Sequence, residues 1–312
     1  MVRKTICFTT VIAALLILSC GGNSRQSKQI KETSTFSLPA IPSMITHPAE
    51  RADYLAGHYW DNLDFNDTSL IHKPEILEQA FVNFIDIFPH VTEGTLKQSI
   101  HKTLERALIN ESMFSHFTDL FEKYLYDPNA PMRNEECYAF VVDYIIESEE
   151  IDDINKVRPL FQLEQIKKNR RGTIAIDFVY TLSNGRQESM HRIKADYTIL
   201  FFNNPGCIAC GEYQQGLELA PVVTQLMGAG RLKILAMYVD EDIASWEGYR
   251  ASIPSSWING YDAPVAIRNG NLYDLRAIPS LYLLDKEKRV LLKDALPNQI
   301  EEMLIYYVQN GL

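Results

Sequence analysis

The sequence is poor in cysteine and has no excess of positive charge. Five cysteines in 312 residues are too few for a fold built on disulfides. Thirty Lys and Arg residues against forty Asp and Glu residues give a formal net charge of −10. No basic run could neutralise phosphates, which argues against nucleic-acid binding. Hydrophobic residues make up 46% and charged residues 22%, so disordered and fibrous classes are excluded, and the length suits two domains.

Only one apolar run is long, and it lies at the N-terminus. A positive start at Arg3 and Lys4 precedes apolar residues 6–18, and Ser19 and Cys20 follow. This pattern predicts a signal peptide over residues 1–19 rather than a spanning helix. Cys20 resembles the lipobox cysteine of bacterial lipoproteins, which becomes the lipidated first residue; ordinary cleavage beside an incidental cysteine is the alternative. Acyl chains on Cys20 would anchor the chain to a membrane, and residues 20–45 are expected to form a flexible tether.

Residues 46–169 carry apolar side chains at three- and four-residue spacing, which predicts a domain of about five amphipathic helices. Pro48 and Pro74 open the first two helices. The stretch from Ile154 to Lys168 is expected to connect this helical domain to the next one. The apolar stripes are Leu55, Tyr59 and Leu63; Leu77, Phe81, Phe84 and Phe88; Leu96, Ile100, Leu104 and Leu108; Phe114, Phe117, Phe121, Tyr124 and Leu125; and Tyr138, Val141, Val142 and Ile145.

The helical region offers little chemistry. Its histidines have no spacing that would set two metal ligands on one helical face, so we expect them to be structural. Cys137 is expected to be a small buried side chain, with a redox or partner role as the alternative.

From about residue 170 the pattern changes to strands. Residues 173–182 and 187–193 predict a hairpin around an Asn-Gly turn at Asn184. Buried strands are predicted at 197–202, 232–239, 281–284 and 290–292, with helices over 211–226, 243–253 and 298–308. Gly216 and Pro221 predict that a second piece of the first helix starts near Leu219. Between the strand 197–202 and its following helix lies Cys207-Ile208-Ala209-Cys210. A CxxC at the mouth of a helix, after a strand, is the context of a redox motif.

Residues 170–312 resemble a thioredoxin-fold domain of the membrane-attached, extracytoplasmic TlpA-like and ResA-like thiol–disulfide oxidoreductases. The resemblance lies in FFNNPGCIAC, in LKILAMYVD and in AIPSLYLLD, whose Pro279 matches the family's cis-proline. It implies an α+β protein, in which an all-α domain precedes a thioredoxin-like domain with a central mixed sheet flanked by helices. It also implies that Cys207 attacks, Cys210 resolves, and Pro279 leaves the backbone of Ile278 free to pair with a substrate strand. The helix N-terminus favours the thiolate form of Cys207.

The chain departs from the family pattern in two places. Phe201 stands where thioredoxin carries its buried acid. Glu212 and Asp177 are candidates to substitute for it, with a solvated position in the first turn of the helix as the alternative for Glu212. Residues 255–274 read as an insertion that could form a recognition surface with Trp257, Tyr261 and Tyr273, or pack locally.

These observations predict a lipid-anchored, exported thiol–disulfide oxidoreductase at the cell envelope, facing the periplasm. The resemblance implies that it reduces disulfide-containing envelope proteins with electrons from a membrane donor, and the sequence itself leaves the opposite, oxidising direction open. The Cys207–Cys210 pair is expected to act with no other cofactor. No metal site is expected, because a zinc site needs four ligands and no second cysteine pair exists. The alternatives are a non-enzymatic binding module with an inert disulfide, and a metallochaperone.

Overall fold

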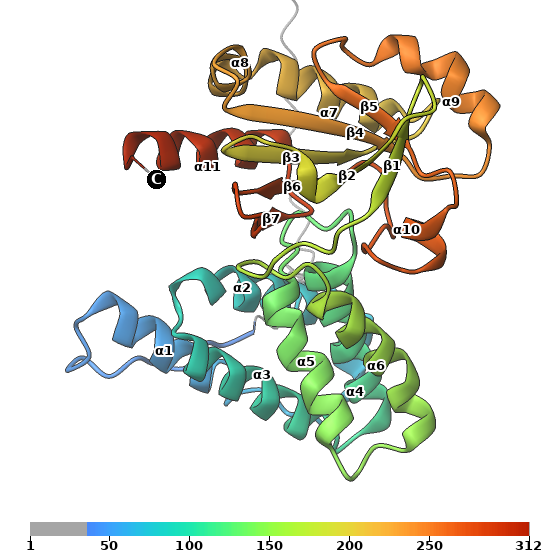
Figure 1. Ribbon diagram of the computed structural model, residues 1–312. Helices are drawn as coiled ribbons and strands as arrows, with labels where there is room; N and C mark the ends of the chain where they lie inside the picture. The colour runs from blue at the N-terminus through green and yellow to red at the C-terminus, as the bar shows by residue number, and fades with distance from the viewer. Residues whose placement is uncertain (1–35, 312) are drawn as a thin grey trace, which may run out of the picture. The chain divides into compact units, whose positions relative to one another are not determined.

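The computed structural model describes residues 36–311, so the predictions for the signal peptide, for Cys20 and for most of the tether lie outside the described residues. Residues 36–312 form one unit by their contacts. The described part combines a run of helices with a seven-stranded mixed sheet and is α+β, as predicted (Figure 1). Within residues 36–311, no helix is both long enough and apolar enough to cross a membrane.

The helical part is built around a cluster of aromatic side chains. The rings of Trp60, Phe81, Phe84, Phe117 and Phe121 are buried and contact one another edge to face, as in the pair Trp60–Phe117 with centroids 5.1 Å apart. All of these rings except Trp60 come from the predicted stripes, most of whose members are buried in the core. The helices are α1 (Pro48–His58), α2 (Leu77–Asp86), α3 (Glu93–Ala107), α4 (Glu111–Phe121), α5 (Glu135–Glu147) and α6 (Asp153–Lys167), with the short 3-10 helices η1 (Thr68–His72) and η2 (Phe88–His90) and the short π-helix η3 (Glu122–Tyr126).

The prediction of a connecting segment at 154–168 was wrong, because helix α6 occupies it. The periodicity misled because this helix buries polar side chains and exposes apolar ones. Gln162 and Gln165 are buried, whereas Ile154 and Phe161 are exposed. The hydroxyl of Tyr138 on α5 donates to Gln162 Oε1 at 3.2 Å, so α6 is held on α5 partly by polar contacts.

The sheet has the order β2-β1-β5-β4-β3-β6-β7. Strand β3 pairs in parallel with β4, and β4 with β5, while β3 pairs antiparallel with β6 and β6 with β7. Every residue of β3 is buried, as expected for a strand covered on both faces. The strands are β1 (Val179–Leu182), β2 (Gln187–Ser189), β3 (Tyr197–Phe202), β4 (Leu232–Tyr238), β5 (Ile258–Tyr261), β6 (Ser280–Leu284) and β7 (Val290–Lys293).

Two separate cores cover the two faces of the sheet. Phe201 and alternate residues of β3, β4 and β6 pack under α7 (Ile208–Leu219), α8 (Pro221–Gly228) and α11 (Pro297–Gln309). Phe202 and the residues of β3, β4 and β6 on the opposite face of the sheet pack under residues 175–193, which include η4 (Met190–Arg192), and under α10 (Ala266–Asn269). The remaining helix α9 (Ile243–Tyr249), followed by η5 (Arg250–Ser252), lies beside β5 (Figure 1).

Residues 255–274 are part of the sheet rather than an inserted surface loop. They include β5, which lies between β4 and β1, and the short helix α10. Trp257 packs its ring against Phe201 and Tyr273 is fully buried, while the ring of Tyr261 lies 4.5 Å from that of Trp246. These aromatics therefore pack locally, which was the second of the two expectations.

Gly260 on β5 offers a test of this packing. A Cβ added there would lie 2.8 Å from Cδ2 of the buried Tyr180 ring, so we expect Gly260→Ala to lower the free energy of unfolding by about 1–3 kcal/mol. The control is Gly248→Ala in α9, where nothing lies within 4 Å and alanine should stabilise the helix by up to ~1 kcal/mol. Urea unfolding of both variants measures the difference, and equal effects would contradict it.

Candidate redox site

The CxxC motif lies where β3 gives way to α7. The turn passes through Gly206, whose φ of +73° suits glycine, and Cys207 is the N-cap of α7. Cys207 and Cys210 form a disulfide, and the backbone N–H of Cys210 donates to Sγ of Cys207 at 3.1 Å. Cys207 is half-buried whereas Cys210 is fully buried. An attacking sulfur from another molecule can therefore reach Cys207 more readily than Cys210.

The segment before β6 lies against this disulfide. The Ile278–Pro279 peptide bond is cis, and the carbonyl oxygen of Ile278 lies 3.7 Å from Sγ of Cys207. Within residues 36–311, the backbone groups of Ala277 and Ile278 make no hydrogen bond to other backbone groups. The structure thus brings together the four predicted site residues Cys207, Cys210, Ile278 and Pro279.

Neither of the two acids considered as a substitute for thioredoxin's buried acid is itself buried. Asp177 accepts hydrogen bonds from the N–H groups of Phe178 and His191 and from the Ser189 hydroxyl, so its carboxylate holds the hairpin together. Glu212 is exposed. Phe201 is fully buried in the core.

A different acid, Asp294, lies next to the cis-proline segment. The antiparallel register pairs Tyr282 with Lys293, which brings Asp294 to Ser280, the residue after Pro279. The Ser280 hydroxyl donates to the Asp294 carboxylate. Burial raises the pKa of the Asp294 carboxyl, and the positive charge of Arg133 opposes this shift.

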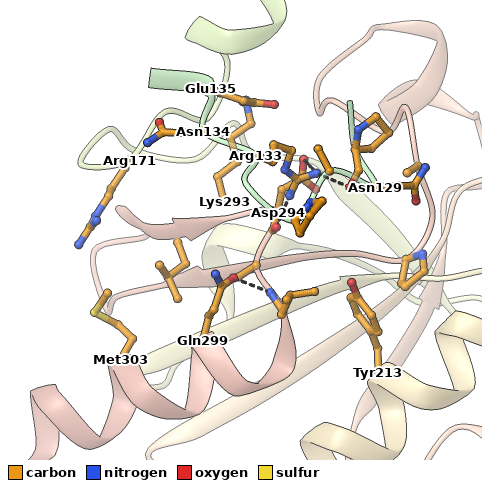
Figure 2. Close-up of a pocket in the computed structure, with 18 of the residues that line it drawn as sticks. Asn129, Arg133, Asn134, Glu135, Arg171, Tyr213, Lys293, Asp294, Gln299 and Met303 are labelled. Carbon is orange, nitrogen blue, oxygen red and sulfur yellow. Dashed lines mark hydrogen bonds and ion pairs between the residues drawn. The ribbon is translucent and has the colours of Figure 1, made fainter. Parts of the chain in front are cut away.

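Arg133 belongs to the helical part of the chain. Its Nη1 lies 3.4 Å from Oδ2 of Asp294, and its Nη2 donates to the Asp294 carbonyl oxygen. Figure 2 shows Arg133 reaching toward Asp294 from the segment that precedes α5. The two side chains are mostly buried, with exposed fractions of 18% and 13%.

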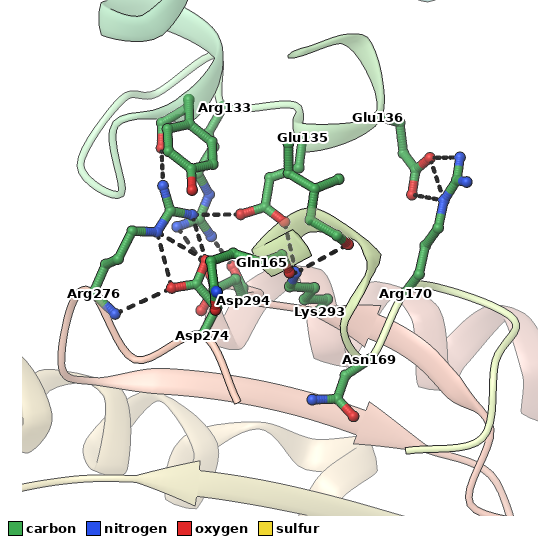
Figure 3. Close-up of polar contacts among 12 residues, drawn as sticks. Arg133, Glu135, Glu136, Gln165, Asn169, Arg170, Asp274, Arg276, Lys293 and Asp294 are labelled. Carbon is green, nitrogen blue, oxygen red and sulfur yellow. Dashed lines mark hydrogen bonds and ion pairs between the residues drawn. The ribbon is translucent and has the colours of Figure 1, made fainter. Parts of the chain in front are cut away.

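A second set of ion pairs joins the same two regions. Nε of Arg276 donates to both carboxylate oxygens of Asp274 at 2.9 and 2.8 Å, and its Nη2 donates to Glu135 at 2.6 Å. Its guanidinium lies 3.5 Å above the ring of Tyr126. Glu135 also accepts from Lys293 Nζ at 2.8 Å (Figure 3). The cis-proline segment is therefore flanked on both sides by residues bound to the helical part.

A cleft of about 1080 Å³ opens between these elements. Ala209, Tyr213, Ile278 and Pro279 line it on the side of the disulfide, side chains of α11 including Met303 and Tyr306 line another side, and residues 128–136 line the third (Figure 2).

The other candidate groups lie apart from this cleft. Among residues 36–311, no group of three His, Cys, Asp or Glu side chains is arranged to hold a metal ion. Cys137 is free and buried, as expected, and burial raises the pKa of its thiol to about 12.

A solved structure shares this fold over most of the chain. A thioredoxin-like protein from Bacteroides caccae ATCC 43185, known from its crystal structure, is 49% identical; the match covers 88% of this chain and 99% of that one, with a TM-score of 0.84. The chain belongs to the thioredoxin-like proteins. Residues 19–169 match the family model of a domain of unknown function, DUF5106. No curated protein matches the chain.

Two further solved structures cover only the thioredoxin-like domain. The C-terminal domain of an uncharacterized protein from Bacteroides fragilis NCTC 9343 is 49% identical and covers 44% of this chain and 98% of its own, with a TM-score of 0.43. The thioredoxin domain of a thiol-disulfide oxidoreductase from Bacteroides vulgatus is 17% identical over 44% of this chain and 97% of its own, with a TM-score of 0.39.

Sequence reasoning missed Asp294, Arg133 and Arg276. Asp294 could have been found by pairing the predicted strands 281–284 and 290–292 as a hairpin, since continuing the observed register, in which Tyr282 pairs with Lys293, places Asp294 opposite the start of the first strand. No signal in the sequence identifies Arg133 as its partner, because 161 positions separate the two.

The buried Arg133–Asp294 pair predicts a pH-dependent loss of stability. Burial raises the pKa of Asp294 and Arg133 opposes this shift, so removal of Arg133 raises the pKa further. In Arg133→Ala the unpaired buried carboxylate is therefore progressively neutralised by protonation as the pH falls. We expect the variant to lose about 3 kcal/mol of unfolding free energy at pH 8 and clearly less at pH 4, each against wild type at the same pH. In the control Arg158→Ala, which breaks an exposed pair with Glu122, the loss of unfolding free energy should stay below ~1 kcal/mol at both pH values. An equal loss at both pH values for Arg133→Ala would contradict the assignment.

Proposed function

We propose that this thioredoxin-like protein is a thiol–disulfide oxidoreductase that reduces disulfides in envelope proteins. One observation carries the proposal: the Cys207–Cys210 disulfide lies at the N-terminus of α7, with the more accessible sulfur beside the backbone of Ile278. The Cys210 N–H and the N-terminus of α7 stabilise negative charge on Cys207 once it is reduced. Cys207 is thus placed as nucleophile, and the buried Cys210 as resolving thiol.

The proposed reaction is a two-electron exchange. In the reduced protein, the Cys207 thiolate attacks one sulfur of the substrate disulfide, forms a mixed disulfide and releases the other substrate sulfur as a thiolate, which takes up a proton. Cys210 then loses its proton and attacks Sγ of Cys207, which releases the second substrate thiol. The substrate gains two electrons and two protons, and the protein ends with the Cys207–Cys210 disulfide. A dithiol electron donor at the membrane restores the reduced form.

The proposed location follows from the N-terminal sequence. Residues 1–19 have the pattern of a signal peptide, and Cys20 would carry the lipid that holds the protein at the membrane, facing the periplasm. A chain with net charge −10 is not drawn to anionic lipid by charge, so the acyl chains would supply the attachment.

Substitution of each cysteine tests the mechanism. Cys207→Ser should lower reduction of a peptide disulfide to the uncatalysed rate, because the nucleophile is lost. Cys210→Ser should still attack but fail to resolve, so intact-mass spectrometry should show a stable mixed disulfide on Cys207. For wild type, equilibration with dithiothreitol should give a potential more negative than the roughly −180 mV of disulfide isomerases. A disulfide that never exchanges would instead favour a binding module with an inert thioredoxin-like scaffold.

Lipid attachment has its own test. When the full chain is expressed in a bacterium with a lipoprotein export pathway, we expect it in the detergent phase after Triton X-114 partition. Cys20→Ala should move it to the aqueous phase, since the acylated residue is lost. Cys137→Ala is the matched control, because this buried cysteine carries no lipid and its loss should leave partition unchanged. Wild type in the aqueous phase would rule out the anchor.

A further inference from the structure

We infer that the segment Pro128–Asn134 of the helical domain forms one wall of the substrate cleft and selects disulfides carried on an extended polypeptide. This inference rests on the proposed function. It gives the helical domain a role in the redox site, although that domain contains neither cysteine of the reacting pair.

The first support is the lining of the cleft. Asn129, Ala130 and Arg133 line the same cavity as Ala209, which lies between the two cysteines, and Ile278, whose carbonyl oxygen lies against Cys207. A substrate that extends from Cys207 into this cleft therefore meets the helical domain.

The second support is that the wall is fixed in place. Arg133 bonds both to the Pro128 carbonyl oxygen at 3.2 Å, within its own segment, and to Asp294 beside the cis-proline segment. Glu135, directly after the wall, pairs with Arg276 and Lys293. These contacts hold the wall at one distance from the cis-proline segment.

The third support concerns the kind of molecule that fits the cleft. A volume of about 1080 Å³ lies at the upper end of the range that encloses a whole small ligand, so a small disulfide would fill only part of it. The backbone groups of Ala277 and Ile278 make no backbone hydrogen bond within residues 36–311, and such groups bind extended chains by strand addition. Exposed Tyr306 on α11 adds an apolar contact surface. An extended polypeptide matches all three features.

The experiment uses the full chain purified in detergent and compares its reaction with two disulfide substrates. One is the small disulfide 5,5′-dithiobis(2-nitrobenzoic acid), and the other is an unstructured synthetic peptide with one disulfide. Asn129→Trp places a large ring at an exposed position of the wall, and Tyr306→Ala removes the facing apolar contact. With the protein reduced beforehand and mixed with each disulfide for a single turnover, we expect both variants to lower the second-order rate constant for the peptide by about tenfold, with the small-disulfide rate constant and the Cys207–Cys210 reduction potential unchanged. The matched control, Asn155→Trp on the exposed surface of α6, should behave as wild type.

The outcomes separate the inference from the proposed function. If wild type exchanges with neither substrate, the proposed function fails and the inference fails with it. If wild type exchanges with both, and Asn129→Trp matches wild type on the peptide, the inference is overturned while the oxidoreductase stands. Equal losses on both substrates would also overturn it, because the wall would then affect the disulfide itself rather than select its carrier.

Discussion

The buried carboxylate of Asp294 is the constraint on which the arrangement of this site depends. A carboxylate removed from water is unfavourable by several kcal/mol unless a cation and hydrogen bonds compensate it. Ser280, from the strand that follows Pro279, supplies a hydrogen bond, and the cation is Arg133 from the helical domain. The negative charge of Asp294, which borders the candidate redox site, is therefore balanced only where the helical domain contacts the thioredoxin-like domain.

The ion pairs also restrict how a substrate could be recognised. Arg133 and Lys293, which line the cleft, and Arg276 beside it each have a carboxylate partner: Asp294 for the first, Glu135 for the second, Asp274 and Glu135 for the third. Since these three cations are already neutralised, they offer little attraction to an anionic group. Arg171, which also lines the cleft, is in no ion pair within residues 36–311. The backbone before Pro279 and the apolar side chains of α11 are contacts that any extended polypeptide can make, and Arg171 is the cleft cation left for an anionic group.

The sequence predicted the elements that carry strong local signals, and it failed where tertiary contacts decide. The continuous apolar run 197–202 predicted β3 residue by residue, and the strand–CxxC–helix order predicted the thioredoxin-like fold. Helix α6 was missed because Gln162 and Gln165 are buried while Ile154 is exposed, which inverts the usual periodicity. Strand β5 was missed because Ile258–Tyr261 is short and contains Asn259 and Gly260, which are typical of loops. The Arg133–Asp294 pair depends on the packing of distant segments, which no local pattern encodes.

The connection between the two domains supports a fixed cleft rather than a mobile one. The segment after α6, which joins the two domains, is hydrogen-bonded to the thioredoxin-like domain. The side-chain N–H of Asn169 donates to the Leu272 carbonyl oxygen at 2.8 Å, and its side-chain oxygen accepts from the backbone N–H of Ile176. Gly172 and Ala175 donate to backbone oxygens of Val290 and Lys288 at 2.8 Å each. Two sets of contacts therefore join the domains: the hydrogen bonds of the linker and the ion pairs around the cis-proline segment. Two separate attachments oppose rotation about either one, so the proposed function requires a substrate that fits the cleft with the helical domain in this position.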